Sequence, residues 1–321
     1  MTKLEELLQS INCSHVYIQT HNYPDPDALA SAKGLQYLLE KRGMSATICY
    51  KGYIDKFNTL QMIEHLHIEI HAENELSLSP EDEIILVDCQ KGNTNVDDFM
   101  GTSIACIDHH KLQETSFYRF FDIRSNVGSC STIIASYFIE NDIPLTKDMA
   151  TLLLYGLKMD TANLTRGASD LDVDMFGILF KQADKEILLA LDACSLSLCD
   201  LGSYTRAIEN LRIYNDIGFA NIGNDCSEAM IGTLSDFILT LTEVHFSVVY
   251  SYRAGGLKFS VRSDNTRYDG AKIIKQALKG YGDGGGHVRM AAGFIPNLSC
   301  EKAERIAPII EGRILNILAL Q

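Results

Sequence analysis

Short apolar runs that alternate with helical patterns place the strongest constraint on how this chain folds. Two of these runs, 83–88 and 103–108, have the composition of fully buried strands and end on an acidic residue. Two shorter strand patterns cover 15–19 and 46–50, and helical spacing of apolar residues follows them at 28–42 and 57–66. The alternation predicts βαβ units, and therefore an α/β domain built on a mostly parallel sheet.

The pattern changes beyond residue 190. Residues 191–215 have helical patterns without an obvious strand, which predicts a helical linker. Further on, the strand patterns 246–250 and 257–261 flank a turn signal, and helical patterns cover 271–278 and 303–318. We therefore expect a first domain at 1–190, a linker at 191–215 and a smaller α+β domain at 216–321.

Charge and composition exclude several classes of protein. The chain has 28 Lys and Arg against 42 Asp and Glu, so its net charge is −14, which disfavours long duplex nucleic acid as a partner. No uncharged apolar run reaches the roughly 18 residues of a membrane span. The N-terminus resembles an amphipathic helix rather than a secretion signal, and the nine cysteines form no C-x-x-C pair. These features predict a cytoplasmic protein with reduced thiols.

A histidine and two aspartates, His21, Asp25 and Asp27, crowd a turn rich in proline directly after the first strand pattern. In open α/β sheets ligands bind at the carboxyl ends of strands, and imidazole with carboxylates suits Mn²⁺ or a similar divalent cation. The other interpretation is a helix N-cap, because aspartate is favoured at that position and a helix follows. On these residues alone both interpretations stay open.

Further acids and histidines follow the two buried strands. Asp88 ends the first, Asp108, His109 and His110 follow the second, and Asp160 ends a helical run. The ends of parallel strands share one edge of a sheet, so these groups are expected to converge there. Carboxylates at this density repel one another unless cations neutralise them, and the number of ligands suits two ions. Two ions can clamp the oxygens of a phosphoryl displacement and activate a water.

A glycine-rich stretch, 282–293, is the second candidate site. Consecutive glycines allow backbone N–H groups to approach an anion, and His287 lies beside them, while Arg262 projects from a predicted strand. The alternative is a tight structural turn between a helix and a strand. Residues 251–295 hold eight basic residues against three acids, 8 − 3 = +5, which favours an anionic ligand.

Together these motifs resemble the DHH/DHHA1 phosphoesterase family, most of all its nanoRNase, phosphoadenosine-phosphatase and cyclic-dinucleotide phosphodiesterase members. The motifs are His21-x3-Asp25-x-Asp27, Asp88, Asp108-His109-His110, Asp160-Thr161, Phe259–Ser263 and Gly284-Gly285-Gly286-His287. The resemblance implies an N-terminal DHH domain with a five-stranded parallel sheet, a helical linker, and a smaller DHHA1 domain across a cleft. Departures are Pro26, where Gly or Thr is more usual, and Asn163 in a segment where Gly-Phe is common.

The resemblance also implies a specific role for each of the site residues. It assigns one Mn²⁺ (Co²⁺ or Mg²⁺ being alternatives) to His21, Asp25 and Asp88, and a second to Asp27, Asp88, His109 and Asp160. His110 then faces the scissile phosphate, Asp88 bridges the ions, and Asp108 orients the histidines from behind. The distal nucleotide is assigned to Arg262, Gly285, Gly286 and His287.

The expected activity is hydrolysis of short linear dinucleotides such as pApA or pGpG, with cyclic dinucleotides as further substrates. Three alternatives remain: a pyrophosphatase or exopolyphosphatase, a phosphatase of 3′-phosphoadenosine 5′-phosphate, and a nucleotide-binding regulatory protein without turnover. The expected partner is therefore a small nucleotide, and a homodimer stays open.

Overall fold

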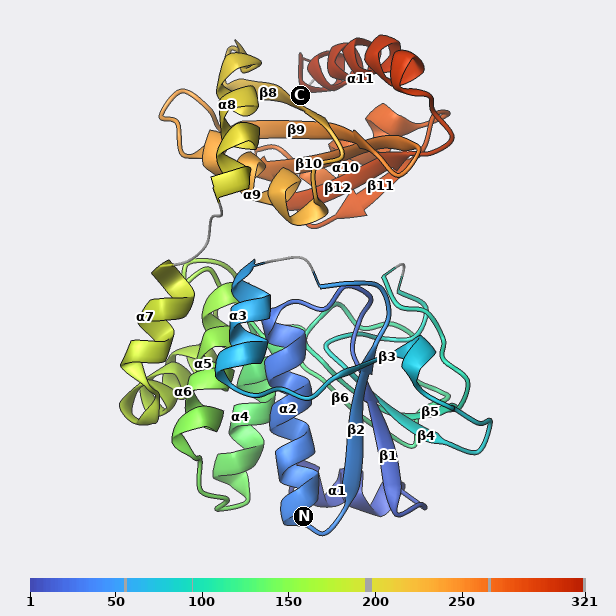
Figure 1. Ribbon diagram of the computed structural model, residues 1–321, viewed down its shortest axis with the longest axis vertical. Helices are drawn as coiled ribbons and strands as arrows, with labels where there is room; N and C mark the ends of the chain where they lie inside the picture. The colour runs from blue at the N-terminus through green and yellow to red at the C-terminus, as the bar shows by residue number, and fades with distance from the viewer. Residues whose placement is uncertain (55–56, 94, 194–197, 265–266, 320–321) are drawn as a thin grey trace. The chain divides into compact units, whose positions relative to one another are not determined.

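The chain forms two compact units, Met1–Ser195 and Leu196–Gln321, in the computed structural model of Figure 1. The structure describes residues 1–54, 57–93, 95–193, 198–264 and 267–319. Each unit contains one six-stranded sheet with helices packed on it.

The sheet of the first unit is parallel throughout, in the order β3-β2-β1-β4-β5-β6. Its strands are β1 (His15–Gln19), β2 (Ser45–Tyr50), β3 (His71–Ala72), β4 (Glu83–Val87), β5 (Thr102–Asp108) and β6 (Phe120–Ile123). The predicted α/β fold is therefore present, with six strands instead of five, because the short β3 adds an edge strand beside β2. The order reverses between β1 and β4, so a crevice for ligands is expected at their carboxyl ends.

Helices cover one face of this sheet (Figure 1). The first unit contains α1 (Lys3–Ser10), α2 (Pro26–Lys41), α3 (Phe57–His65), α4 (Cys130–Glu140), α5 (Lys147–Asp160), α6 (Asp170–Gln182) and α7 (Lys185–Ala193). Apolar residues of α2, α4 and α5 bury Ile18, Ile85 and Ile107 of the strands. The alternate strand residues, such as Leu86, pack on the opposite face against connecting segments that include Phe99 and Tyr118.

The second unit is an α+β structure with a mixed sheet in the order β11-β12-β10-β9-β8-β7. Its strands are β7 (Arg212–Tyr214), β8 (Ile217–Asn224), β9 (Phe246–Arg253), β10 (Gly256–Ser263), β11 (Asp283–Gly286) and β12 (Met290–Ile295). Only the β8–β9 pair is parallel among these described strands. Its helices are α8 (Leu201–Glu209), α9 (Glu228–Leu239), α10 (Gly270–Leu278) and α11 (Cys300–Ala319). Helices α10 and α11 share one apolar core with the sheet, and α8 and α9 share another.

Two expectations about the second half differ from the structure. The segment 191–215, predicted to be a helical linker without a strand, contains the strand β7, which pairs with β8, and α8, which packs on β8 through the buried Ala207. The glycine-rich segment is not a turn, because Asp283–Gly286 forms the edge strand β11 and pairs with β12. The predicted hairpin is confirmed, since Arg253 pairs with Gly256 at the turn between β9 and β10.

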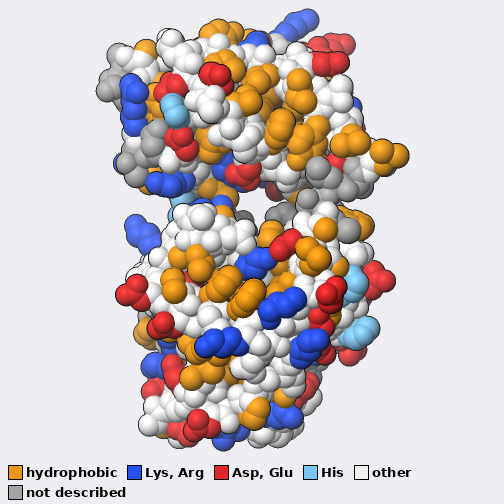
Figure 2. All heavy atoms as spheres, turned by 90° about the vertical axis from the view of Figure 1, so that its left-hand side faces the viewer, with side chains coloured by type: hydrophobic (Ala, Val, Ile, Leu, Met, Phe, Trp, Pro, Cys, Tyr) orange, Lys and Arg blue, Asp and Glu red, His pale blue; other side chains and the backbone are white. Residues whose placement is uncertain are grey.

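Charged and sulfur-containing side chains are distributed without a dominant feature. On the face drawn in Figure 2, lysine and arginine side chains lie among aspartate and glutamate. The described cysteines are free thiols: Cys13, Cys49, Cys89, Cys106, Cys130, Cys226 and Cys300. Cys194 and the side chain of Cys199 lie outside the described residues. None of the described helices combines the length and the apolar character that crossing a membrane requires.

Close packing of α5 on α2 and α4 brings the end of α5 to the crevice. Gly156 of α5 makes this approach possible, because a Cβ atom there would overlap Ser131 Oγ and lie 2.8 Å from Ala30 Cβ. The same Cβ would lie 3.2 Å from the Cα of Asp27. A side chain at residue 156 would therefore push α5, with Asp160 at its end, away from α2.

We expect Gly156→Ala to destabilise the first unit by about 1–3 kcal/mol, because overpacking outweighs the roughly 1 kcal/mol that alanine gains in helix propensity. The matched control is Gly177→Ala in α6, where a Cβ atom meets nothing within 4 Å. Alanine at residue 177 should leave the unit unchanged or more stable. Denaturant unfolding of both variants measures the difference, and equal effects of the two substitutions would refute the packing argument.

Candidate metal centre

The turn after β1 places His21 and Asp25 at the mouth of the crevice. The Oδ1 of Asp25 accepts hydrogen bonds from the backbone N–H groups of Asp27 (3.0 Å) and Ala28 (3.1 Å), so the N-cap interpretation is confirmed for Asp25. The cap does not exclude ligation, since His21 Nε2 lies 3.9 Å from Asp25 Oδ1 and 3.7 Å from Asp88 Oδ2. The Nδ1 of His21 contacts the carbonyl of Asn22 at 2.9 Å, which leaves Nε2 facing the carboxylates.

Asp88 lies at the centre of the group. It follows β4 in the left-handed region, with φ of 59°, which is uncommon for residues other than glycine, asparagine and aspartate. Its backbone N–H donates to the carbonyl of Ile107 at 2.9 Å and joins the ends of β4 and β5. The carboxylate is buried, and within the described residues its Oδ1 has no hydrogen-bond donor. A buried carboxylate oxygen left in this way is the position that a cation would fill.

His109 connects Asp88 to the end of α5. Its Nε2 lies 3.3 Å from Asp88 Oδ1 and 3.2 Å from Asp160 Oδ2, and its Nδ1 lies 3.2 Å from the carbonyl of Val127. Donation from Nδ1 to that carbonyl would leave the lone pair of Nε2 directed at the carboxylates. Metal-binding histidines commonly have this arrangement.

The N-terminus of α4 holds the carboxylate of Asp27. Its Oδ2 accepts from the N–H of Cys130 at 2.8 Å, and its Oδ1 accepts from the N–H of Ser131 at 2.9 Å. Free N–H groups at the start of a helix stabilise a carboxylate there. Because these two bonds orient the carboxylate, Asp27 can direct its remaining lone pairs at a cation shared with His109 and Asp160.

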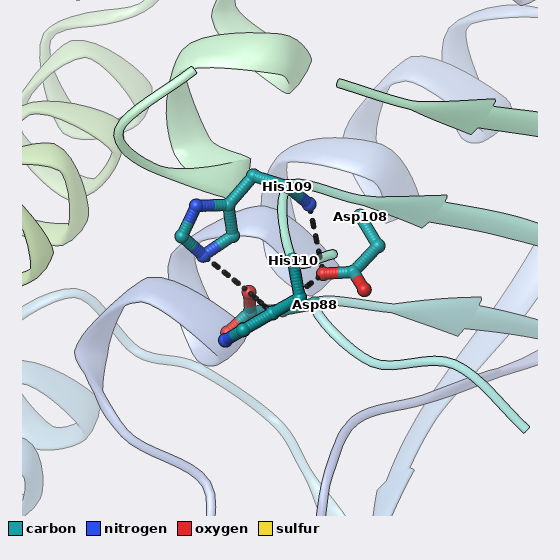
Figure 3. A group of neighbouring side chains, drawn as sticks. All are labelled: Asp88, Asp108, His109 and His110. Atoms are coloured by element: carbon teal, nitrogen blue, oxygen red, sulfur yellow. Dashed lines mark hydrogen bonds and ion pairs between the residues drawn. The ribbon is translucent and has the colours of Figure 1, made fainter. Parts of the chain in front are cut away.

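Asp108 orients the two histidines without facing the crevice. Its Oδ1 accepts from the backbone N–H of His109 and lies 2.8 Å from Nδ1 of His110, while its Oδ2 accepts from Gln90 at 2.6 Å. In Figure 3 the ring of His109 points toward Asp88, and the carboxylate of Asp108 faces the backbone of His109. His110 Nδ1 is 3.8 Å from Asp88 Oδ1, so His110 borders the same group.

The acids in this group of side chains shift the pKa values of their neighbours. Burial, with the charges of Asp88 and Asp160, raises the pKa of Asp27 well above its ordinary value, and burial raises the pKa of Asp160 to about 6. Although burial opposes it, the hydrogen bond to Asp25 and nearby carboxylate charge raise the pKa of His21 to about 9. Burial also opposes protonation of His109, yet Asp88 raises its pKa well above the ordinary value.

The donor atoms fall into groups whose chemistry fits divalent cations. Two groups, each with ligand atoms within 4.8 Å of one another, consist of His21, Asp25 and Asp88, and of Asp27, His109 and Asp160. Asp88 belongs to the first group and approaches the second through His109. A third group joins Asp88 and His109 to Asp108 and His110. Imidazole nitrogens with carboxylate oxygens suit Mn²⁺ and related ions.

The predicted binding residues of the second unit line one pocket of about 320 Å³. These residues are Arg262 of β10, Gly285 and Gly286 of β11, and His287. Arg262 donates to Asp236 Oδ1 at 2.8 Å and to Ser260 Oγ at 2.9 Å, which fixes its guanidinium at the pocket wall. Gly286 has a φ of 132° and admits no side chain, because a Cβ atom would lie 2.6 Å from the carbonyl of Met290.

Several residues of the two sites were not predicted. Lys258 and Glu228 line the pocket, and Asp236 pairs with Arg262. In the first unit, Gln90 supports Asp108, and the backbone of Cys130 and Ser131 holds Asp27. The serine N-cap signal at Ser129 marks the start of α4, but nothing in the sequence indicates which carboxylate its N–H groups bind.

Comparison with known proteins identifies a family match in the first unit. Residues 15–157 match the N-terminal domain of the DHH family. A protein of Methanocaldococcus jannaschii without an assigned function is 27% identical over 95% of this chain and 64% of its own length. The manganese-dependent inorganic pyrophosphatase of the same organism is 30% identical over 50% of this chain and 52% of its own length. The chain therefore spans between half and two thirds of these curated relatives.

A solved structure extends the comparison to both units. An exopolyphosphatase-related protein from Bacteroides fragilis has a TM-score of 0.80, with 18% identity, over 99% of this chain and 97% of its own. At this identity the likeness concerns the fold.

The geometry predicts how many Mn²⁺ ions each variant binds. We expect two ions for the unaltered protein, fewer than one for Asp88→Asn, because Asp88 contacts both groups, and one for Asp160→Asn. Equilibrium dialysis with Mn²⁺ measures the stoichiometry. The control is Glu83→Gln. Glu83 is a buried carboxylate at the amino end of β4, at the end of the strand opposite Asp88, and it pairs with Arg119. Two ions retained by Asp88→Asn would contradict the shared position of Asp88.

Proposed function

The N-terminal domain of this chain belongs to the DHH family, and on that premise we propose that the protein is a phosphoester hydrolase that uses two divalent cations, Mn²⁺ by preference. Its proposed substrates are short nucleotides, with linear dinucleotides such as pApA or pGpG first and cyclic dinucleotides second. The proposed cleavage takes place at the carboxyl ends of β1, β4 and β5.

One observation carries this proposal. Two groups of acid and imidazole ligands meet at Asp88, and Asp88 Oδ1 is buried without a hydrogen-bond donor among the described residues. A single structural cation would need only one of the two groups. When bound, two neighbouring cations polarise a phosphoryl group and lower the pKa of a water, which is the chemistry of phosphoester hydrolysis.

The chain's own residues supply the orientation and the proton. Asp108 holds Nδ1 of His110 at 2.8 Å and so fixes the orientation of the His110 ring beside Asp88. Burial opposes protonation of His110, but the hydrogen bond to Asp108 and the charge of Asp88 raise its pKa. We assign to His110 the donation of a proton, or of a charge-assisted hydrogen bond, to a phosphoryl or leaving-group oxygen.

The pocket of the second unit is proposed to bind the part of the substrate that is not cleaved. Lys258 and Arg262 lie at its wall, paired with Glu228 (3.0 Å) and Asp236 (2.8 Å), so that an anionic ligand would compete with these acids, and His287 adds a ring that can stack on a base or bond a phosphate. Gly285 lacks any steric reason to be glycine, because a Cβ atom there would meet nothing within 4 Å. Its small size instead keeps the pocket open to a ligand.

Inorganic pyrophosphate is the second candidate substrate. The observation that favours it is the 30% identity of half of this chain to a manganese-dependent inorganic pyrophosphatase, although the matched part covers only 52% of that protein. Pyrophosphate has no base or sugar, so its hydrolysis would not require the pocket of the second unit. The two candidates therefore predict different effects of changes in that pocket.

We expect Mn²⁺-dependent turnover of pApA and pGpG that EDTA abolishes. The panel should also contain cyclic dinucleotides, 3′-phosphoadenosine 5′-phosphate and pyrophosphate, with product release followed by chromatography. Hydrolysis of pyrophosphate alone would replace the proposed substrate class. Binding of nucleotides without any turnover in Mn²⁺ would instead favour a regulatory protein.

Gly285→Ala should lower kcat/KM for dinucleotides by about tenfold or more, because one added methyl group obstructs the pocket. Pyrophosphate hydrolysis should not change. The control is Gly312→Ala in α11 of the same unit, where a Cβ atom also meets nothing within 4 Å. Unchanged dinucleotide kinetics, or equal losses on both substrates, would remove the pocket from the proposal.

A further inference from the structure

Asp172 is a fully buried carboxylate in the first turn of α6, outside every group of candidate ligands. Part of its role is ordinary, since Asp172 and Ser169 form a capping box in which Asp172 Oδ2 accepts from the N–H of Ser169 at 2.7 Å. Most residues at this capping position interact only with their own helix end. Asp172 also accepts hydrogen bonds from residues that are distant from it in the sequence.

The same carboxylate bonds to a segment that lies 40 to 44 residues before it. Its Oδ2 accepts from the backbone N–H of Gly128 at 2.8 Å, and its Oδ1 accepts from the hydroxyl of Thr132 at 2.5 Å. With the N–H and hydroxyl of Ser169, four donors converge on one buried carboxylate. Gly128 fits this approach, because a Cβ atom there would lie 3.1 Å from Asp172 Oδ2 and 2.7 Å from Thr161 Cγ2.

The segment that Asp172 holds, 127–132, is the one that orients two of the candidate metal ligands. Its first residue, Val127, offers the carbonyl that contacts Nδ1 of His109 at 3.2 Å. The next two residues after Ser129, Cys130 and Ser131, both donate their backbone N–H groups to Asp27. The bonds from Asp172 fall on Gly128, directly after Val127, and on Thr132, directly after Ser131, so they flank the Cys130 and Ser131 contacts along the chain.

We propose that Asp172 is a positioning residue of the metal centre: it clamps the segment 127–132 and so sets the directions of the Asp27 carboxylate and the His109 imidazole. This inference rests on the proposed function for its catalytic consequence. Asp172 acts through the backbone N–H of Gly128 and the hydroxyl of Thr132, and none of its hydrogen bonds among the described residues goes to a candidate ligand. Partners of this kind, bonded to the groups that orient metal ligands, typically contribute 10–100-fold to metal affinity or activity.

Asp172→Ala removes all four acceptor contacts and should weaken Mn²⁺ binding by 10–100-fold, measured by calorimetric titration of the metal-free protein. Asp172→Asn should recover most of the affinity, because its oxygen can remain on Gly128 and Ser169 while its NH₂ turns to the hydroxyl of Thr132. The matched control is Glu83→Ala, which removes a buried, multiply bonded carboxylate at the amino end of β4. The control should lower the unfolding temperature without changing Mn²⁺ affinity.

A second readout needs no metal. Hydrogen exchange of the peptide covering 127–133 should be faster in Asp172→Ala than in Glu83→Ala, because the N–H groups that hold Asp27 lose their support. If Asp172→Ala does not fold, Thr132→Val removes one of the four donors and should shift both readouts in the same direction by a smaller amount.

Wild-type Mn²⁺ affinity and unchanged exchange in Asp172→Ala or Thr132→Val, with only a lower unfolding temperature, would reduce Asp172 to a tether between α6 and α4. The proposed function can fail separately. If no nucleotide is hydrolysed but Asp172→Ala loses Mn²⁺ affinity, the substrate assignment is wrong and the positioning role stands.

Discussion

Repulsion among the carboxylates of Asp27, Asp88 and Asp160 is the constraint on which the arrangement of the first unit depends. All three face one small region that is largely closed to water, where burial and mutual charge raise the pKa of Asp27 and Asp160. The fold offsets part of this cost, since two N–H groups at the start of α4 hold Asp27 and the imidazole of His109 lies between Asp88 and Asp160. Asp88 Oδ1 remains without a hydrogen-bond donor among the described residues, and divalent cations would neutralise the negative charge that is left there.

The supporting architecture keeps these acids together. A parallel sheet whose order reverses between β1 and β4 brings the ends of distant strands to one edge, and a glycine on α5 lets that helix approach closely enough to deliver Asp160. Segment 127–132 then fixes the orientation of two ligands with backbone groups. Rigid elements therefore set the geometry, and the ligands themselves lie at element ends, where side chains are free to converge.

Much of the first unit can be predicted from the sequence, because buried parallel strands are continuous apolar runs and their carboxyl ends lie at the same edge of the sheet. Strands ending at Asp88 and Asp108 therefore predict a shared site before any coordinates are known. Asp172 and Gln90 escape this reasoning, since an ordinary polar residue gives no sign of a partner 40 or 18 residues away. The sequence of α8 predicts a linker, because an amphipathic pattern does not indicate which sheet a helix packs on. The glycines of β11 resemble a turn because glycine has low strand propensity, although pairing with β12 overrides it.

Anomalous X-ray scattering at the manganese absorption edge, from crystals of the protein grown with Mn²⁺, tests the central claim most directly. The account predicts two peaks about 3.5–4 Å apart, one beside His21 and Asp25 and the other beside Asp27, His109 and Asp160, with the carboxylate of Asp88 between them. A single peak, two peaks that do not share Asp88, or an ordered water hydrogen-bonded to Asp88 Oδ1 in place of an ion would contradict it.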